Sequence, residues 1–439
     1  MQPPCACVAG FPRGRLYLTG VTIAAAQTPP RELPAYAAAI VCYFVGFGIQ
    51  MVLFPYLIAN TLGASPQAVG AAQAAGQLPL LVLLLWGGVA AERAPTRAWL
   101  VGLHALAAAP ALGLAALIAA DQLSYAVMLG FGAVMGALTA FLMPARDAAL
   151  NGVVARDTAA GRSTDLQKSI AAVTAAQLGA QVVGMTLAGF AGAAPVEALL
   201  CVQAGAFGLA ALFCLRLARR EPAKPRSGRN PIAEIREGLS LTLRHDVLLP
   251  MVLIGLYVGV FIIGSFSVLF PLMIRDEFAL GAQALSAAFV AFWTGSFLSS
   301  IVLSRRAAIV RPGRALLFAQ AIGAAALASF AIEKPFALFL ASVFIWGLAA
   351  GVAFAMSRTI VQEAAPAMAI ARVLAIYSLG FMGGAPVGAA LMGLSAEVLG
   401  VRMAALVPAI GLLVGIALVA TRTPIWRLSR DAEGTTAVA

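Results

Sequence analysis

The chain has 439 residues, of which 62% are hydrophobic and 11% are charged, and its formal net charge is +11. So high an apolar fraction excludes an ordinary soluble domain and predicts a polytopic membrane protein. The positive charge does not require a nucleic-acid partner, because Lys and Arg in loops beside an anionic membrane leaflet account for it.

Residues 1–34 contain no run long enough to span a bilayer, and we expect them to form a cytoplasmic N-terminal arm. Cys5 and Cys7 have no further metal ligands nearby, so no metal site is predicted there. The arginines of this segment fall in its middle, which is not the pattern of a signal peptide.

From residue 35 onward, apolar runs of about 20 residues recur, and each can cross a hydrocarbon core of ~30 Å as a helix. We predict an all-α integral membrane protein with twelve transmembrane helices in two six-helix halves, residues 35–217 and 247–422. The expected helices cover 36–60, 68–91, 98–120, 123–153, 166–192, 196–217, 247–274, 284–303, 315–332, 335–362, 371–394 and 401–421.

Residues 218–246 are predicted to form a charged cytoplasmic linker between the halves. Ile232, Ile235, Leu239 and Leu243 recur there at helical spacing with charges between them, which indicates an amphipathic helix on the membrane surface. Residues 423–439 are expected to be a cytoplasmic tail.

Two segments of the chain repeat each other. In each, an arginine ends an apolar helix, a polar turn follows, and the next helix contains three glycines spaced five residues apart. The glycines match at one constant offset: Gly179, Gly184 and Gly189 correspond to Gly383, Gly388 and Gly393. Repeats of about half the chain length indicate two equivalent halves, as in many transporters, and the glycines allow close packing of helices in lipid.

Orientation follows from the distribution of cations. Of the 29 Lys and Arg residues, only Arg275, Lys334 and Arg402 fall on the far side of the predicted membrane. Because cytoplasmic loops retain Lys and Arg, we expect both termini to be cytoplasmic.

The loop between the second and third helices contains Gly88, Glu92, Arg93 and Arg97, which together resemble a motif of major facilitator superfamily transporters. Residues 144–157 and the Phe270-Pro-Leu segment resemble the drug and siderophore exporters of that superfamily, the branch of the enterobactin exporter. This copy departs from the motif at Glu92, where the family usually has Asp, and at Pro95, where it usually has Gly. Many antiporters of the superfamily have Gly-Pro where this chain has Gly179-Ala180.

The resemblance implies alternating access. Glu92, Arg93 and Arg97 would then form a latch that closes the cytoplasmic side in one conformation. Arg146 with Asp147, and Arg358 with Glu363, suggest the same role. The alternative for all of them is a topological anchor with no conformational role.

Polar and aromatic residues within the spans are the candidates for a substrate cavity, since each polar group in a span is costly unless it faces a cavity or a partner. By resemblance they fall on helices that line or flank the cavity: Tyr43, Gln50, Gln73, Gln77, Gln177, Gln181, Tyr257, Trp293, Trp346 and Tyr377. An apolar, aromatic cavity with a few amides suits an amphipathic or lipophilic organic solute.

These observations predict a monomeric exporter of drug-like or siderophore-like compounds in a bacterial inner membrane. A lipid or lysolipid transporter and a non-transporting receptor or scaffold remain alternatives. No Ser-His-acid set, phosphate loop or cofactor motif occurs in the sequence, so an enzyme is not predicted. Because no Asp or Glu falls in mid-span, we expect any coupling to protons to use an acid at a helix end, Glu92 or Asp147 first.

Overall fold

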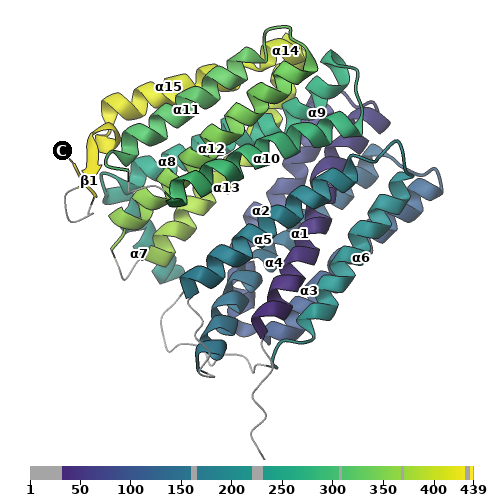
Figure 1. The fold of residues 1–439 in the computed structure, drawn as a ribbon, viewed down its shortest axis with the longest axis horizontal. Helices are drawn as coiled ribbons and strands as arrows, with labels where there is room; N and C mark the ends of the chain where they lie inside the picture. Colours follow the sequence, from purple (N-terminus) through teal and green to yellow (C-terminus); the bar gives the residue numbers. More distant parts are fainter. Residues whose placement is uncertain are drawn as a thin grey trace, which may run out of the picture.

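The computed structural model describes residues 32–159, 166–219, 231–305, 309–366, 370–430 and 436–438 (Figure 1). The predicted N-terminal arm therefore lies mostly outside the described residues, as does the first part of the linker. The first helix begins at Glu32, earlier than residue 36. Glu32 is only 6% exposed, and its carboxylate pairs with Arg156 at 2.6 Å, which joins the start of this helix to the end of the fourth.

The first half consists of α1 (Glu32–Tyr56), the π turn η1 (Leu57–Thr61), α2 (Pro66–Arg93), α3 (Thr96–Ala119), α4 (Tyr125–Ala159), α5 (Leu166–Ala188) and α6 (Val196–Cys214). α7 (Pro231–Arg244) falls within the linker. Leu239 and Leu243 are 43% and 54% exposed on it, so the rest of the protein leaves these two residues of the predicted apolar face uncovered.

The second half begins with a helix interrupted by π turns: α8 (Leu248–Val258), η2 (Gly259–Ile263), η3 (Ser265–Leu269), α9 (Phe270–Leu272) and η4 (Met273–Glu277). It continues with α10 (Ala282–Arg305), α11 (Pro312–Ser329), α12 (Phe336–Ala364), α13 (Ile370–Leu399), α14 (Val401–Ala404) and α15 (Leu406–Arg422).

Within the described residues, 10 helical segments are long and apolar enough to cross a membrane. α5 and α11 complete the predicted set of twelve spans, although the apolar part of α5, Ala172–Ala188, is shorter. The predicted all-helical membrane fold is confirmed. In the part of the chain that the structure describes, β structure consists of one isolated β-bridge between Ala191 and Ala194 and a short two-stranded hairpin near the C-terminus.

The two halves have the same internal packing. In the first, α1 packs against α5, α2 against α4, and α3 against α6. In the second, α8 packs against α13, α10 against α12, and α11 against α15. Between the halves, α2 packs on α13 and α5 packs on α10, which are equivalent pairs under the repeat. Figure 1 shows the halves as two bundles, purple to teal and green to yellow.

Two ends of the molecule are distinguished below. The terminal face is the end where α1 begins and α15 finishes. The distal face is the opposite end, where η1, η4 and α14 lie. The tail beyond α15 is not a free extension: η5 (Pro424–Arg427), β1 (Leu428–Arg430) and β2 (Thr436–Val438) fold against α11 and α12. Ile425 is fully buried against Gly313, and the Arg314 guanidinium lies 5.2 Å from the Trp426 ring.

Candidate functional site

The distal face is where the halves touch most closely. A Cβ added to Gly393 of α13 would lie 2.8 Å from both the Gly70 Cα and the Pro66 carbonyl oxygen of α2. A Cβ added to Gly189, just beyond α5, would lie 2.9 Å from the Ser286 Cβ of α10. Only glycine fits without displacing neighbours, so these two positions let the helices of opposite halves approach closely.

Hydrogen bonds between described residues of the two halves lie on the same side. Gln73 Nε2 donates to the Ser267 carbonyl at 3.1 Å, and Ser286 Oγ donates to the Met185 carbonyl at 2.6 Å. The backbone N–H of Gln67 donates to the carboxylate of Glu397 at 3.2 Å. Arg275 and Asn60 make the others. Among described residues, every cross-half hydrogen bond is in the distal half of the molecule, so this end is closed.

The remaining predicted packing glycines serve other places. A side chain at Gly184 would overlap the Val45 carbonyl of α1, and one at Gly388 would overlap Val260 of η2, so both glycines pack helices within one half. A Cβ at Gly383 would make only an ordinary contact, 3.7 Å from Leu81 Cδ1. A Cβ on Gly179 would meet nothing within 4 Å, so close packing does not extend to that position.

The terminal face has a different character. Asp147 of α4 and Arg358 of α12 belong to opposite halves, and the Arg358 charge favours the Asp147 carboxylate, although less than the neighbouring Arg146 does. Arg93 and Arg97 form no ion pair within the described part of the chain, and the side chain of Glu92 lies outside it. Glu363 is exposed near the end of α12.

Arg146 is not available as a latch in this conformation. It is 9% exposed, and its guanidinium carbon lies 4.3 Å from the centre of the Tyr43 ring and 4.8 Å from that of Phe44. The Tyr36 hydroxyl donates to its backbone carbonyl at 2.8 Å. A desolvated cation over two aromatic faces gains about 2 kcal/mol. The side chain therefore belongs to the interior of the first half.

Five of the predicted cavity residues keep partly exposed side chains: Gln50, Gln77, Gln177, Tyr257 and Trp293, from α1, α2, α5, α8 and α10. α2, α5 and α10 are among the helices that meet between the halves. Gln50 also accepts a hydrogen bond from Gln203 of α6 at 3.3 Å.

The other predicted cavity residues are held in packing. Tyr43 (2% exposed) packs against Phe207 and His104, and Trp346 is fully buried among aromatic rings of the second half. Gln181 is 4% exposed and its Nε2 contacts Met51 Sδ at 3.4 Å. For these three the predicted exposure to a cavity is wrong in this conformation, because an almost wholly apolar helix gives no signal of which face is buried.

Gln73 is 9% exposed and joins the halves, as described above. The Tyr257 hydroxyl donates to Gln320 Oε1 at 2.8 Å, and Tyr377 shares a 2.7 Å hydrogen bond with Ser357. Both tyrosines are therefore anchored within the second half.

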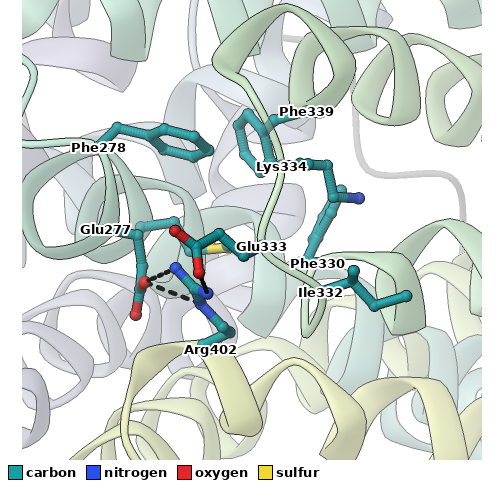
Figure 2. A pocket seen from close by; sticks show the side chains of 9 residues that line it. Glu277, Phe278, Phe330, Ile332, Glu333, Lys334, Phe339 and Arg402 are labelled. Carbon is teal, nitrogen blue, oxygen red and sulfur yellow. Dashed lines mark hydrogen bonds and ion pairs between the residues drawn. The ribbon is translucent and has the colours of Figure 1, made fainter.

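A small pocket opens at the distal face of the second half (Figure 2). Arg402 of α14 bonds Glu277 and Glu333 there, the latter at 3.3 Å, while Lys334 donates to Ser329 Oγ at 2.8 Å. Burial lowers the pKa of the Lys334 ammonium below its usual range. All of its lining residues belong to the second half, so the pocket is not the passage between the halves.

The sequence matches the Major Facilitator Superfamily over residues 36–371 and again over residues 265–435. The chain belongs to the major facilitator superfamily. It is therefore a multi-pass membrane transporter and not an enzyme. No curated protein matches the sequence.

Solved structures of the superfamily share its fold. The nucleoside transporter NupG has a TM-score of 0.69 at 14% identity and covers 88% of this chain and 98% of its own. A bacterial homologue of the human lysosomal transporter Spinster, in an inward-facing and occupied conformation, has a TM-score of 0.65 at 15% identity, covering 89% and 96%. A POT family transporter in complex with 5-aminolevulinic acid has a TM-score of 0.68 at 11% identity, covering 90% and 96%.

Proposed function

We propose that this transporter exports small amphipathic or lipophilic organic compounds, drug-like or siderophore-like, across a bacterial inner membrane by alternating access. The observation that supports alternating access best is the one-sided distribution of cross-half hydrogen bonds among described residues. In this proposal the terminal face is cytoplasmic, so the structure corresponds to a state that loads substrate from inside.

The substrate class rests on the side chains that remain partly exposed on the helices between the halves. Gln77 and Gln177 offer amides, Trp293 offers the carbon surface of an indole whose N–H is buried, and none of the three has a fixed charge. Such a surface binds an organic solute through apolar area and a few hydrogen bonds. Because the three solved structures named above are each at most 15% identical to this chain, their own cargoes do not select a substrate for it.

Closure of the terminal face would use the residues that the sequence motifs identify. Asp147 and Arg358 lie on opposite halves and attract each other across that face, and Glu92, Arg93, Arg97 and Glu363 are further candidates. Protons are a candidate coupling ion, with Asp147 and Glu92 as the first acids to test. We expect a monomer to be sufficient for transport.

The proposal is tested by thiol labelling with and without substrate. A cysteine at Gln177 should react with an aqueous thiol reagent and be protected by a lipophilic cation such as tetraphenylphosphonium, whereas a cysteine at Leu106 on the outer surface of α3, 56% exposed, should react slowly and show no protection. Equal labelling at both positions would contradict a solute path beside α5.

A second arm separates the alternatives. Cells that contain the protein should accumulate less of the same cation than cells that lack it, and liposomes that contain it should not scramble fluorescent lipids. Scrambling without cation efflux would instead identify a lipid transporter, and neither activity would favour a receptor or scaffold.

A further inference from the structure

Two segments at the distal face have the same unusual backbone. Residues 57–64, Leu-Ile-Ala-Asn-Thr-Leu-Gly-Ala, end the first helix of the first half, and residues 273–280, Met-Ile-Arg-Asp-Glu-Phe-Ala-Leu, end the first helix of the second half. Each begins with a π turn, η1 or η4. Each then reverses through a residue with positive φ, Gly63 at 59° and Ala279 at 51°.

The backbone hydrogen bonds match position by position. The Leu62 amide bonds the Leu57 carbonyl at 2.9 Å, and the Ala64 amide bonds the Ile58 carbonyl at 3.1 Å. In the second half, the corresponding bonds are Phe278 to Met273 at 3.2 Å and Leu280 to Ile274 at 2.9 Å. The two helix ends are therefore copies of one structure, related by the repeat.

A helix end of this kind leaves carbonyl groups without partners in the helix, and the helix dipole makes them attractive to a cation. Here the donor comes from the opposite half. Arg275 Nη1 donates to the Ala59 carbonyl at 2.8 Å and to the Ala64 carbonyl at 2.6 Å. In return, Asn60 Nδ2 contacts the Leu280 carbonyl, which is equivalent to that of Ala64, at 3.5 Å.

The neighbouring carboxylate orients the arginine. Arg275 Nε and Nη2 both donate to Asp276, the latter at 2.9 Å, so one edge of the guanidinium is fixed and Nη1 points to the carbonyls of the first half. The Arg275 side chain is 21% exposed, which limits competition from water. Lysine could not reproduce this arrangement, because its ammonium has no planar fork.

We propose that Arg275 is the clamp that holds the distal face shut. It caps the last turn of the first helix from the opposite half of the chain, and Asp276 positions it. The clamp must release whenever the distal face opens, because its acceptors and its donor belong to opposite halves. Such a role would also account for a cation at Arg275, on the side of the membrane where the predicted topology has almost none.

The inference rests on alternating access and does not depend on the cargo. The whole protein in detergent, without substrate, is compared by hydrogen–deuterium exchange as wild type and as Arg275→Ala. Exchange over residues 57–65 and over the contact of α2 with α13 should become about tenfold faster or more, since each charge-assisted hydrogen bond contributes that much.

The matched control is Arg402→Ala, which removes the same charge at the same face. Among the described residues, Arg402 bonds Glu277 and Glu333, both of its own half, so its loss should change exchange near residues 273–281 and 401–405 and leave residues 57–65 as in the wild type. Similar acceleration of residues 57–65 in both variants would overturn the proposal, as would no acceleration in Arg275→Ala.

Arg275→Lys gives a second test if Arg275→Ala does not fold. It keeps the positive charge but loses the fork with Asp276, so we expect acceleration of residues 57–65 that is smaller than in Arg275→Gln. Equal exchange in Arg275→Lys and the wild type would show that charge alone suffices and would contradict the clamp. Because no substrate is present, a failure of labelling at Gln177 would count against the proposed cargo and not against this clamp.

Discussion

The two ends of the molecule join its halves by different physical means. At the distal face, glycines bring backbones into contact and donors such as Arg275 reach carbonyls of the opposite half. At the terminal face, no hydrogen bond or ion pair joins Asp147 to Arg358 among the described residues; the Arg358 charge favours the Asp147 carboxylate from a distance, and less strongly than Arg146 of the same half does. Hydrogen bonds and van der Waals contacts vanish over a few ångströms, whereas charges attract over about 8–10 Å at physiological salt. In such a transporter the halves touch at the distal face and attract each other at the terminal face. Opening of the distal face can therefore be accompanied by closing of the terminal face.

The largest effect on closure of the distal face is expected from a substitution at a glycine that joins the halves there. Gly393→Ala places a Cβ 2.8 Å from the backbone of α2, so we expect it to weaken distal closure by about 1–3 kcal/mol. Gly383→Ala is the control, because it lies on the same helix, has the same change in helix propensity and makes only a 3.7 Å contact. Hydrogen exchange of residues 66–73 is the measurement, and equal exchange in the two variants would contradict the assignment of the contact.

A smaller effect is expected where the duplicated turns reverse at the same face. Gly63 has φ of 59°, so Gly63→Ala should lower the stability of the folded protein by about 1 kcal/mol, because a Cβ is disfavoured there. Ala279 already bears that cost at φ of 51°, and Ala279→Gly should therefore change stability little, since the relief of strain is offset by the greater freedom of the unfolded chain. Thermal unfolding of both variants in detergent measures the difference, and a stabilising Gly63→Ala would show that the turn is not as described.

The smallest effect belongs to the terminal face. Neutralising Asp147 with Asn, or Arg358 with Gln, should disfavour closure of that face by under about 1 kcal/mol, and the double variant should add little to either single one. Because the attraction acts through solvent, it should weaken at high ionic strength, whereas the distal contacts should not. Inter-half distances measured at low and high salt provide the comparison. Additive effects of the two single variants would mean that the residues do not act as a pair.

Much of the fold could be predicted from the sequence, because bilayer thickness fixes the length of each apolar run and the repeat fixes the equivalence of the halves. The glycine repeat also indicated close packing, although nothing at the level of sequence separates Gly393, which joins the halves, from Gly179, where an added Cβ would meet nothing within 4 Å. The difference depends on which face of α5 or α13 meets a neighbour, and a helix that is apolar on all sides does not reveal it.

The candidate site was harder to predict for the same reason. Tyr43 and Trp346 were expected to face a cavity and are buried within their own halves. Arg275 was noticed only as a cation on the unexpected side of the membrane. Its acceptors are the backbone carbonyls of Ala59 and Ala64, and a backbone acceptor cannot be recognised from the types of the side chains. The tail that docks through Ile425 was missed because its apolar segment is too short for a periodic signal.

The most direct test of the account is to follow both ends of the molecule in one sample. Spin labels at Gln122 and Ile332 report the separation of the halves at the distal face, and labels at Arg219 and Arg305 report it at the terminal face, with the native cysteines replaced by alanine. All four positions are exposed. We predict that Arg275→Ala increases the first distance and decreases the second together, as expected for two alternating closures. An increase of the distal distance with an unchanged terminal distance would contradict alternating access in this protein.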